Sequence, residues 1–251
     1  MRLTRVFVAA ALAPGTIVDL PAEAAAHLAR VLRARAGDEL VLFAGDGFEY
    51  AGEIDSVRGS RVSVSVGRGT PIDRESPLQL TLVQCVPRGD RMDLIVQKAT
   101  ELGVTRIVPV LSQRSVVRLG AAQAESKTAH WRAVSVNACE QCGRNRLPVI
   151  EPPAPLITYL GRDPVAAAAR WVLEPESGQA APTAPATAAE IAVGPEGGFA
   201  DDELEAFRIA GFARLTLGPR ILRTETAAIA AIAWWQTRLG DLSGRQNLWN
   251  L

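Results

Sequence analysis

The stretch LQLTLVQCVPRGDRMDLIVQKATELGVTRIVPVL, residues 78–111, decides the fold class of this chain. It begins with an almost continuous apolar run, which is typical of a strand buried on both faces. Apolar residues then recur at helical spacing, at Met92, Ile95, Ala99 and Leu102. Asp90 suits the N-cap of this helix and Gly103 suits its end, and a second apolar run follows. Strand, helix and strand without a hairpin turn predict a right-handed βαβ unit in a parallel sheet covered on both faces.

The remainder of the C-terminal part continues this alternation. We expect helices over about 121–145, 201–211 and 224–239, and strands within 147–150, 170–174, 190–194 and 213–218. The run PESGQAAPTAPATAA, residues 175–189, is expected to form a flexible loop because its composition cannot pack a core. Residues 78–251 are therefore predicted to form one α/β domain.

Residues 1–70 follow a different pattern, with short strands and one helix. Two extended runs flank Asp46 and Gly47, which together are a hairpin signal. The segment SRVSVSVG, residues 60–67, alternates valines with polar residues, as a half-buried strand does, and a short helix is expected over 24–34. We predict a small antiparallel barrel. The stretch 67–77 is rich in Gly, Pro and charge, and we place a linker at 71–77.

The composition narrows the class of protein. The chain has 251 residues, 48% apolar and 22% charged, which is ordinary for a folded protein. Lys plus Arg and Asp plus Glu both number 27, so no net field attracts polyanions, and any polyanion site must be a local cluster. No apolar stretch is long enough to span a bilayer, and we expect no membrane association.

The cysteines and the N-terminal residues indicate the cellular compartment in which we expect the protein. Three cysteines cannot build a disulfide framework, which favours a reducing, cytoplasmic location. The motif CEQC, residues 139–142, suggests either a zinc site or small residues packed on a helix, and we favour packing because paired ligands are missing. The start, MRLTRVFVAAALAPG, resembles a secretory signal peptide, but it runs directly into patterned sequence, so we favour a protein that is not exported.

Two loops could carry chemistry, because ligands of open parallel sheets bind at the carboxyl ends of the strands. GPEGGF, residues 194–199, and LGPRILR, residues 217–223, both follow predicted strands. Gly197 and Gly198 would allow close backbone approach to a ligand, although a plain turn is the alternative. A dinucleotide fingerprint is missing, and acidic residues at the next helix start oppose phosphate: Glu196, Asp201, Asp202 and Glu203. A ligand without phosphate, carrying positive charge, fits better.

Arg220 and Arg223 stand at the start of the last predicted helix. Thr224 is expected to cap this helix and Glu225 suits its first turn, whereas cations are disfavoured there. The two arginines either form surface salt bridges or face an anionic substrate such as RNA, and we favour the second. The helix itself is apolar almost all round, which predicts burial on every side, either at a subunit interface or in a deep core.

A second polar cluster lies in NACEQCGRNR, residues 137–146. Amides and arginines of this kind suit the reading of an RNA base and its phosphate, but a solvated helix end looks the same. The candidate substrate-binding residues are Asn137, Glu140, Gln141 and Arg144, together with Arg220.

These motifs, with QKATELGV and the small N-terminal barrel, resemble the ribosomal RNA small subunit methyltransferase E family of the SPOUT class. The resemblance runs over nearly the whole chain. It implies a PUA-like RNA-binding domain, a knotted parallel-sheet methyltransferase domain with a C-terminal trefoil knot, and a homodimer. It also implies transfer of a methyl group from S-adenosylmethionine to N3 of uridine 1498 in the 16S rRNA of the small ribosomal subunit. The alternatives are another rRNA or tRNA base, an RNA-binding module without activity, and a nicotinamide oxidoreductase.

The resemblance also assigns residues. Arg223 would be catalytic, and the NACEQCGR helix would help form the pocket for the flipped base. The cofactor would be lined by Leu173, Gly194, Pro195, Glu196, Gly197, Gly198, Leu217, Gly218, Ile221, Leu222, Thr226 and Ala227. The stretch 176–189 is longer and looser than the family pattern requires, next to Leu173 and Glu174.

Overall fold

The computed structural model of the chain describes residues 3–163, 168–175 and 186–242. These residues form two compact units. The first contains the described residues up to Glu75 together with Val136–Leu147, and the second contains Ser76–Ser135 and the described residues from Pro148 onward. The return of 136–147 to the first unit was not predicted from the sequence.

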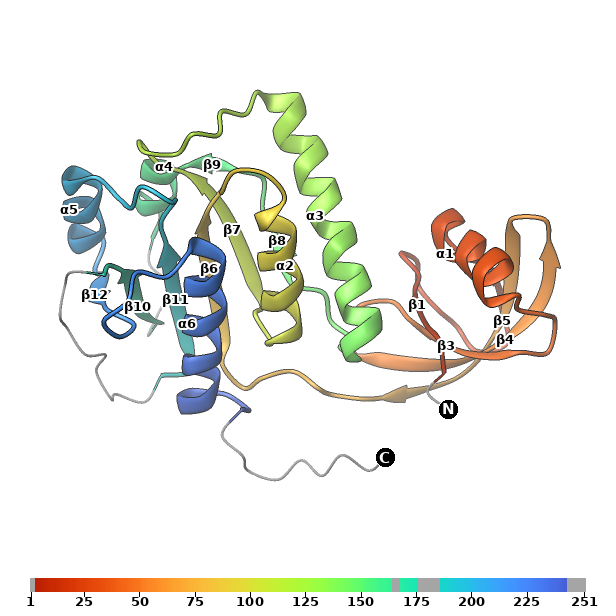
Figure 1. Cartoon of the computed structure of the whole chain (residues 1–251). Helices are drawn as coiled ribbons and strands as arrows, with labels where there is room; N and C mark the ends of the chain where they lie inside the picture. Colours follow the sequence, from red (N-terminus) through yellow and green to blue (C-terminus); the bar gives the residue numbers. More distant parts are fainter. Residues whose placement is uncertain (1–2, 164–167, 176–185, 243–251) are drawn as a thin grey trace. The chain divides into compact units, whose positions relative to one another are not determined.

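The first unit is built on a five-stranded sheet in the order β1-β3-β4-β5-β2 (Figure 1). Its strands are β1 (Arg5–Phe7), β2 (Ile17–Asp19), β3 (Glu39–Phe43), β4 (Phe48–Arg58) and β5 (Arg61–Pro71). Strand β1 pairs with β3 in parallel, so the prediction of a wholly antiparallel barrel was wrong for this one pair. The other three neighbouring pairs are antiparallel. The predicted helix is α1 (Ala22–His27), continued by one π-helical turn, η1 (Leu28–Leu32).

The predicted hairpin joins β3 to β4, and Gly47 has the positive φ of 90° that its turn requires. The alternating valines of β5 point into the core, where Val62, Val64 and Val66 are buried. The core also buries Val6 from the stretch that resembled a signal peptide, so this part of that stretch is built into the first unit. Strand β5 extends to Pro71 and pairs there with Phe48, so the first residue of the linker placed at 71–77 belongs to this strand.

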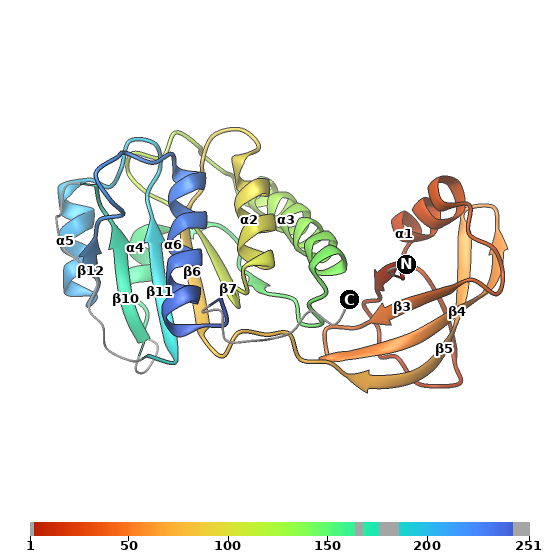
Figure 2. The ribbon, with the colours of Figure 1, turned by 60° about the horizontal axis from the view of Figure 1, so that its bottom comes forward.

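The second unit is the predicted α/β fold with a parallel sheet. The strand order is β12-β10-β11-β6-β7-β8, and Figure 2 shows it from β12 to β7. Its strands are β6 (Gln79–Cys85), β7 (Arg106–Leu111), β8 (Val149–Ile150), β9 (Ala154–Pro155, paired with β7), β10 (Ala168–Leu173), β11 (Ala188–Val193) and β12 (Ala213–Leu215). Its helices are α2 (Arg91–Glu101), α4 (Leu156–Leu160), α5 (Asp201–Ile209) and α6 (Thr224–Leu239). Helix α3 (Ala121–Cys142) starts in this unit and ends in the first.

Each face of this sheet has its own core, as a buried parallel sheet requires. Leu80 and Leu82 of β6 face the core beneath α2 and α6, which lie side by side in Figures 1 and 2. Val83 and Cys85 belong to the opposite core, which α4 and α5 cover. The βαβ unit is confirmed, since β6 and β7 pair in parallel on either side of α2.

Several element bounds differ from the prediction. Strand β11 begins at Ala188 rather than 190, because Ala188 and Ala189 pair with β10 and β6, so the loop expected over 175–189 ends earlier. Residues 176–185 of that loop lie outside the described residues. Asp90 occupies the N-cap of α2, but its side chain makes no capping hydrogen bond.

Helix α6 is not buried on all sides within this chain. Ala228, Ala231 and Ile232 are buried against α2 and the sheet, whereas Ile229 and Trp234 are only half-buried. The deep-core alternative is therefore not realised within this chain, and burial at a subunit interface stays a prediction. The helix keeps an apolar face that the described residues do not fully cover.

Candidate functional site

A cavity of about 370 Å³ opens at the carboxyl ends of β10, β11 and β12, within the second unit. This volume lies in the range of small-molecule sites. Both predicted loops contribute to it, from Gly194 to Gly198 and from Leu217 to Arg223. The full lining is Arg91, Leu173, Glu174, Pro175, Val193, Gly194, Pro195, Glu196, Gly198, Leu215, Leu217, Gly218, Arg220, Ile221, Leu222, Arg223, Thr224 and Ala227.

The cavity therefore brings together most of the residues predicted to bind a cofactor. Two of them lie outside its wall. Gly197 accepts a hydrogen bond at its carbonyl from Arg114 Nη1 at 3.1 Å, and Thr226 is exposed on α6. Gly198 and Gly218 have positive φ angles of 67° and 72°, so the backbone itself requires glycine at these two corners.

The wall is mostly apolar, with charged groups at a few points. Val193 and Leu215 are buried at its base, while Leu173, Leu217 and Leu222 are half-buried along it. Such walls accept a flat organic ring, and the few polar groups then set its orientation.

Thr224 has a different role from the one predicted. The N-cap of α6 is Arg223, whose backbone is extended at φ −64° and ψ 151°, and Thr224 is the first helical residue. The Thr224 hydroxyl donates to the carbonyl oxygen of Gly194 at 2.8 Å and accepts from Gln84 Nε2 at 2.9 Å. The predicted cap was therefore wrong, because this hydroxyl joins α6 to the GPEGG loop.

Arg220 and Arg223 both line the cavity, and both are exposed. Within the described residues, neither guanidinium takes part in an ion pair. The salt-bridge alternative is thus not realised here. Two cations at the wall of a cavity remain available to an anionic partner.

The acidic residues beside the GPEGG loop are engaged by the protein. Glu203 is buried at the start of α5, where it accepts from the backbone N–H of Ala200 at 2.9 Å and of Gln113 at 2.8 Å. Glu196 forms an ion pair with Arg91, and it accepts from the Arg88 backbone N–H at 3.3 Å. These carboxylates lie beside the GPEGG loop, where their charge would repel a phosphate.

Arg91 is a cavity residue that the sequence analysis missed. It is the first residue of α2, and its Nε lies 3.9 Å from Glu225 Oε1, while its Nη1 contacts Glu196. One guanidinium therefore faces carboxylates from the GPEGG loop and from the first turn of α6. Its position at the carboxyl end of β6 was the available signal.

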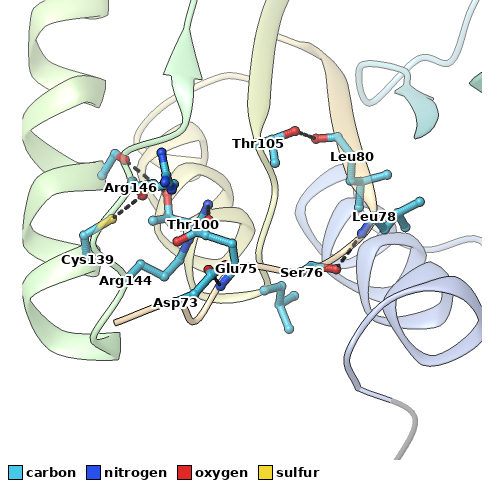
Figure 3. A network of polar contacts seen from close by, with 12 residues as sticks. Asp73, Glu75, Ser76, Leu78, Leu80, Thr100, Thr105, Cys139, Arg144 and Arg146 are labelled. Carbon is cyan, nitrogen blue, oxygen red and sulfur yellow. Dashed lines mark hydrogen bonds and ion pairs between the residues drawn. The ribbon is translucent and has the colours of Figure 1, made fainter. Parts of the chain in front are cut away.

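The other predicted cluster lies in the first unit, at the end of α3. Arg144 is buried, and its Nε donates to Glu75 Oε1 at 3.2 Å and Oε2 at 3.1 Å (Figure 3). Glu140 accepts from the Phe7 backbone N–H at 3.0 Å, and burial raises the pKa of this carboxyl. Asn137 and Gln141 are exposed. Two of the four predicted residues thus make bonds inside the first unit, and two face solvent.

The sequence of residues 74–236 matches the family model of an RNA methyltransferase domain, and that of residues 20–67 matches the family model of an RNA methyltransferase PUA domain. A curated relative, ribosomal RNA small subunit methyltransferase E of Buchnera aphidicola subsp. Schizaphis graminum, is 30% identical over 96% of this chain and 99% of its own length. The chain belongs to the ribosomal RNA small subunit methyltransferase E family.

Two solved structures are similar to this methyltransferase E family member. The Neisseria gonorrhoeae methyltransferase E, bound to S-adenosyl methionine, superposes with a TM-score of 0.87 at 37% identity, covering 96% of this chain and 99% of that one. A Legionella pneumophila structure with bound cofactor SAM gives a TM-score of 0.91 at 36% identity, covering 96% and 100%. The predicted family, the α/β class, the N-terminal PUA domain and the activity of an rRNA methyltransferase are confirmed.

This chain has a further buried polar residue that sequence reasoning missed, Asn145, next to Arg144. Asn145 accepts at Oδ1 from Arg5 Nη2 at 2.6 Å and donates from Nδ2 to the Ile72 carbonyl at 3.0 Å. These bonds link the end of α3 to β1 and to the segment after β5. No local pattern marks such a residue, because its partners are distant in sequence.

The CEQC motif serves packing. Cys139 is buried, its Sγ lies 3.7 Å from the Arg146 carbonyl oxygen, and burial raises its pKa to about 12. In the described residues, no three His, Cys, Asp or Glu side chains gather as metal ligands would. None of the helices in the described residues has the length and apolarity needed to cross a bilayer.

Proposed function

We propose that this chain methylates N3 of uridine 1498 in 16S rRNA of the small ribosomal subunit, with S-adenosylmethionine as methyl donor. We further propose that it works in the cytoplasm as a homodimer with a trefoil-knotted C-terminal segment. The observation that carries the proposal is the cavity between the two Gly-Pro loops, with Arg220 and Arg223 at its wall. The half-buried apolar face of α6, with Ile229 and Trp234, supports a subunit interface.

The residues of the cavity fit this cofactor. Its walls are apolar, its corners are glycines, and the lining includes the carboxylates of Glu174 and Glu196. Carboxylates favour a cationic ligand such as a sulfonium, and the guanidinium groups of Arg220 and Arg223 in the same lining favour an anionic partner beside it. The Neisseria and Legionella relatives, solved with the bound cofactor, support the same assignment.

When bound, S-adenosylmethionine supplies an electrophilic methyl group on a sulfonium, and the protein then has to position the acceptor and manage one proton. N3 of uracil lies on the Watson-Crick edge, so the base must be unpaired before it can react. Arg223 would stabilise the negative charge that develops on the uracil as N3 loses its proton. One such donor contributes about 3 kcal/mol to catalysis. Glu140 and water are the two candidates for the group that accepts this proton.

The test is the single-turnover rate of the Arg223→Ala variant on small-subunit RNA. We expect the rate to fall by about two orders of magnitude, while the dissociation constant of S-adenosylmethionine changes less than about threefold. Arg208→Ala is the matched control, since Arg208 is an exposed arginine on α5 paired with Glu205. If Arg223→Ala methylates as fast as Arg208→Ala, Arg223 has no part in the reaction.

The target base is tested by mapping modified nucleotides on rRNA from cells that lack the protein. Loss of one N3-methyluridine at position 1498, restored by the wild-type gene, is the expected result. Loss of a different methylated rRNA or tRNA base would favour the alternative of the same fold acting on another target. The homodimer is tested by light scattering on the purified chain.

A further inference from the structure

A buried chain of hydrogen bonds connects the central strand β6 to the cavity. Gln84 is the next-to-last residue of that strand, and its side chain is fully buried. Its Nε2 donates to the Thr224 hydroxyl at 2.9 Å and to the Cys85 carbonyl at 2.9 Å. The Thr224 hydroxyl in turn donates to the Gly194 carbonyl at 2.8 Å. Three segments distant in sequence thus meet at one hydroxyl.

These bonds leave the Thr224 side chain a single orientation. Its oxygen accepts from Gln84, so its one proton is directed to Gly194, and the side chain is buried. Arg223 is the residue immediately before, and its own carbonyl accepts from the Ala227 backbone N–H at 2.8 Å. The backbone that carries the Arg223 guanidinium is therefore held on its C-terminal side, while the guanidinium itself is exposed at the cavity.

The amide of Gln84 is kept in this orientation at a cost. Both of its N–H groups donate, but its Oε1 is buried and has no hydrogen-bond partner in the described part of the chain. An unpaired buried acceptor is unfavourable, and such groups concentrate where function constrains the structure. An apolar residue at this position would avoid the unpaired oxygen, but it would also leave the Thr224 hydroxyl without its donor.

We infer that Gln84 and Thr224 are positioning residues, which hold Arg223 and the Gly194 loop in one fixed arrangement around the cavity. The inference rests on the proposed function for its catalytic meaning. It assigns neither residue a contact with the reacting atoms. Displacement of a catalytic group by about 1 Å can slow a reaction about 100-fold, so loss of the chain should act on the rate.

The experiment compares three variants of the full-length protein. Thr224→Val keeps the shape and removes the hydroxyl, Thr224→Ser keeps the hydroxyl, and Gln84→Met removes the donor to it. We expect kcat to fall about 30- to 100-fold in Thr224→Val and about 10-fold in Gln84→Met, and to recover to within about threefold of wild type in Thr224→Ser. The KM for RNA should change far less than kcat.

Amide hydrogen exchange gives a readout that does not depend on activity. The segment 194–198 and the first turn of α6 should exchange faster in Thr224→Val and Gln84→Met, and at the wild-type rate in Thr224→Ser. The control is Thr237→Val, because Thr237 lies on the same helix and, in the part of the chain that the structure describes, its hydroxyl bonds only to the Ala233 carbonyl of that helix. Thr237→Val should match the wild type in both measurements.

The outcomes separate the inference from the proposed function. If wild-type protein methylates RNA and Thr224→Val does so equally fast, the inference is overturned and the proposed function stands. If exchange at 194–198 is the same in Thr224→Val as in Thr237→Val, the inference is also overturned. If exchange changes as expected but wild-type protein methylates no RNA, the anchoring is upheld and the proposed function fails.

Discussion

Helix α6 is held at both ends by a glutamine amide and a hydroxyl, but the two ends differ in how completely these groups are paired. At the start, Gln84 and Thr224 leave the Gln84 Oε1 unpaired among the described residues. At the far end, Gln236 Oε1 accepts from the Ser76 hydroxyl at 2.6 Å, and its Nε2 donates to the Leu102 carbonyl at 2.8 Å. Among the described residues, the glutamine amide at the far end thus has partners for both its oxygen and its nitrogen, whereas the one at the start has an unpaired oxygen.

The packing around the two amides also differs, and it is closer around Gln236 than at the start of the helix. A Cβ on Gly240 would lie 1.7 Å from Gln236 Oε1, and one on Gly103 would lie 2.9 Å from Gln236 Nε2, so glycines close tightly over this amide. At the start of the helix, Thr224 instead lines the cavity. Complete pairing and close packing are typical of residues that stabilise the fold, and incomplete pairing beside a cavity is typical of residues that position a reactive group.

The largest expected effect on stability comes from adding a methyl group at the closely packed C-terminal end of α6. Gly240→Ala places a Cβ against Gln236 Oε1 and 2.8 Å from Ser76 Oγ, which forces these buried groups apart. We expect the free energy of unfolding to fall by about 3 kcal/mol, measured by urea titration. Gly120→Ala is the control, since no atom lies within 4 Å of a Cβ built there. Equal stability of the two variants would show that the far end of α6 is not closely packed.

The next largest effect tests the difference between the amides of Gln236 and Gln84 directly. Gln236→Met leaves the Leu102 carbonyl without its donor and removes an acceptor from Ser76, so we expect the free energy of unfolding to fall by about 2 kcal/mol. The methylation rate of the folded variant should stay within about twofold of wild type. Gln84→Met should show the opposite balance, with a small loss of stability and a large loss of rate. A rate loss in Gln236→Met as large as that in Gln84→Met would remove the distinction between the two ends.

The contrast between the two ends of α6 also shows which features could be predicted from the sequence. The strands, the helices and both Gly-Pro loops follow from local patterns of apolar residues and glycines, and the structure confirms nearly all of them. Thr224 was predicted as a cap because Thr before a helix usually is one, and Arg144 was predicted to face RNA because arginines often do. Each instead bonds to a partner far away in sequence, Gly194 and Glu75.

Such pairings depend on the tertiary fold, so no local pattern reveals them. The partner of Arg144 is 69 residues away and that of Thr224 is 30 residues away. Arg91 was missed for the same reason, because an arginine after an N-cap is usually a solvated residue, and only the fold brings it to Glu196. The sequence thus indicates where the site lies, and the fold decides which side chains serve it.

The smallest expected effect concerns the exposed link at the start of α6. Arg91 joins Glu196 of the GPEGG loop to Glu225 of the first helical turn, but its side chain is 40% exposed, and ion pairs of this kind contribute about 0.5 kcal/mol. Arg91→Gln should therefore raise the dissociation constant of S-adenosylmethionine only two- to threefold, measured by calorimetry at low salt, and the difference should shrink at high salt because solvent ions screen the pair. Lys98→Gln is the control on the same helix, since Lys98 pairs with Glu101 and does not line the cavity. A loss of affinity above tenfold would contradict this expectation, because it would mean that Arg91 contacts the cofactor itself and does more than join the GPEGG loop to α6.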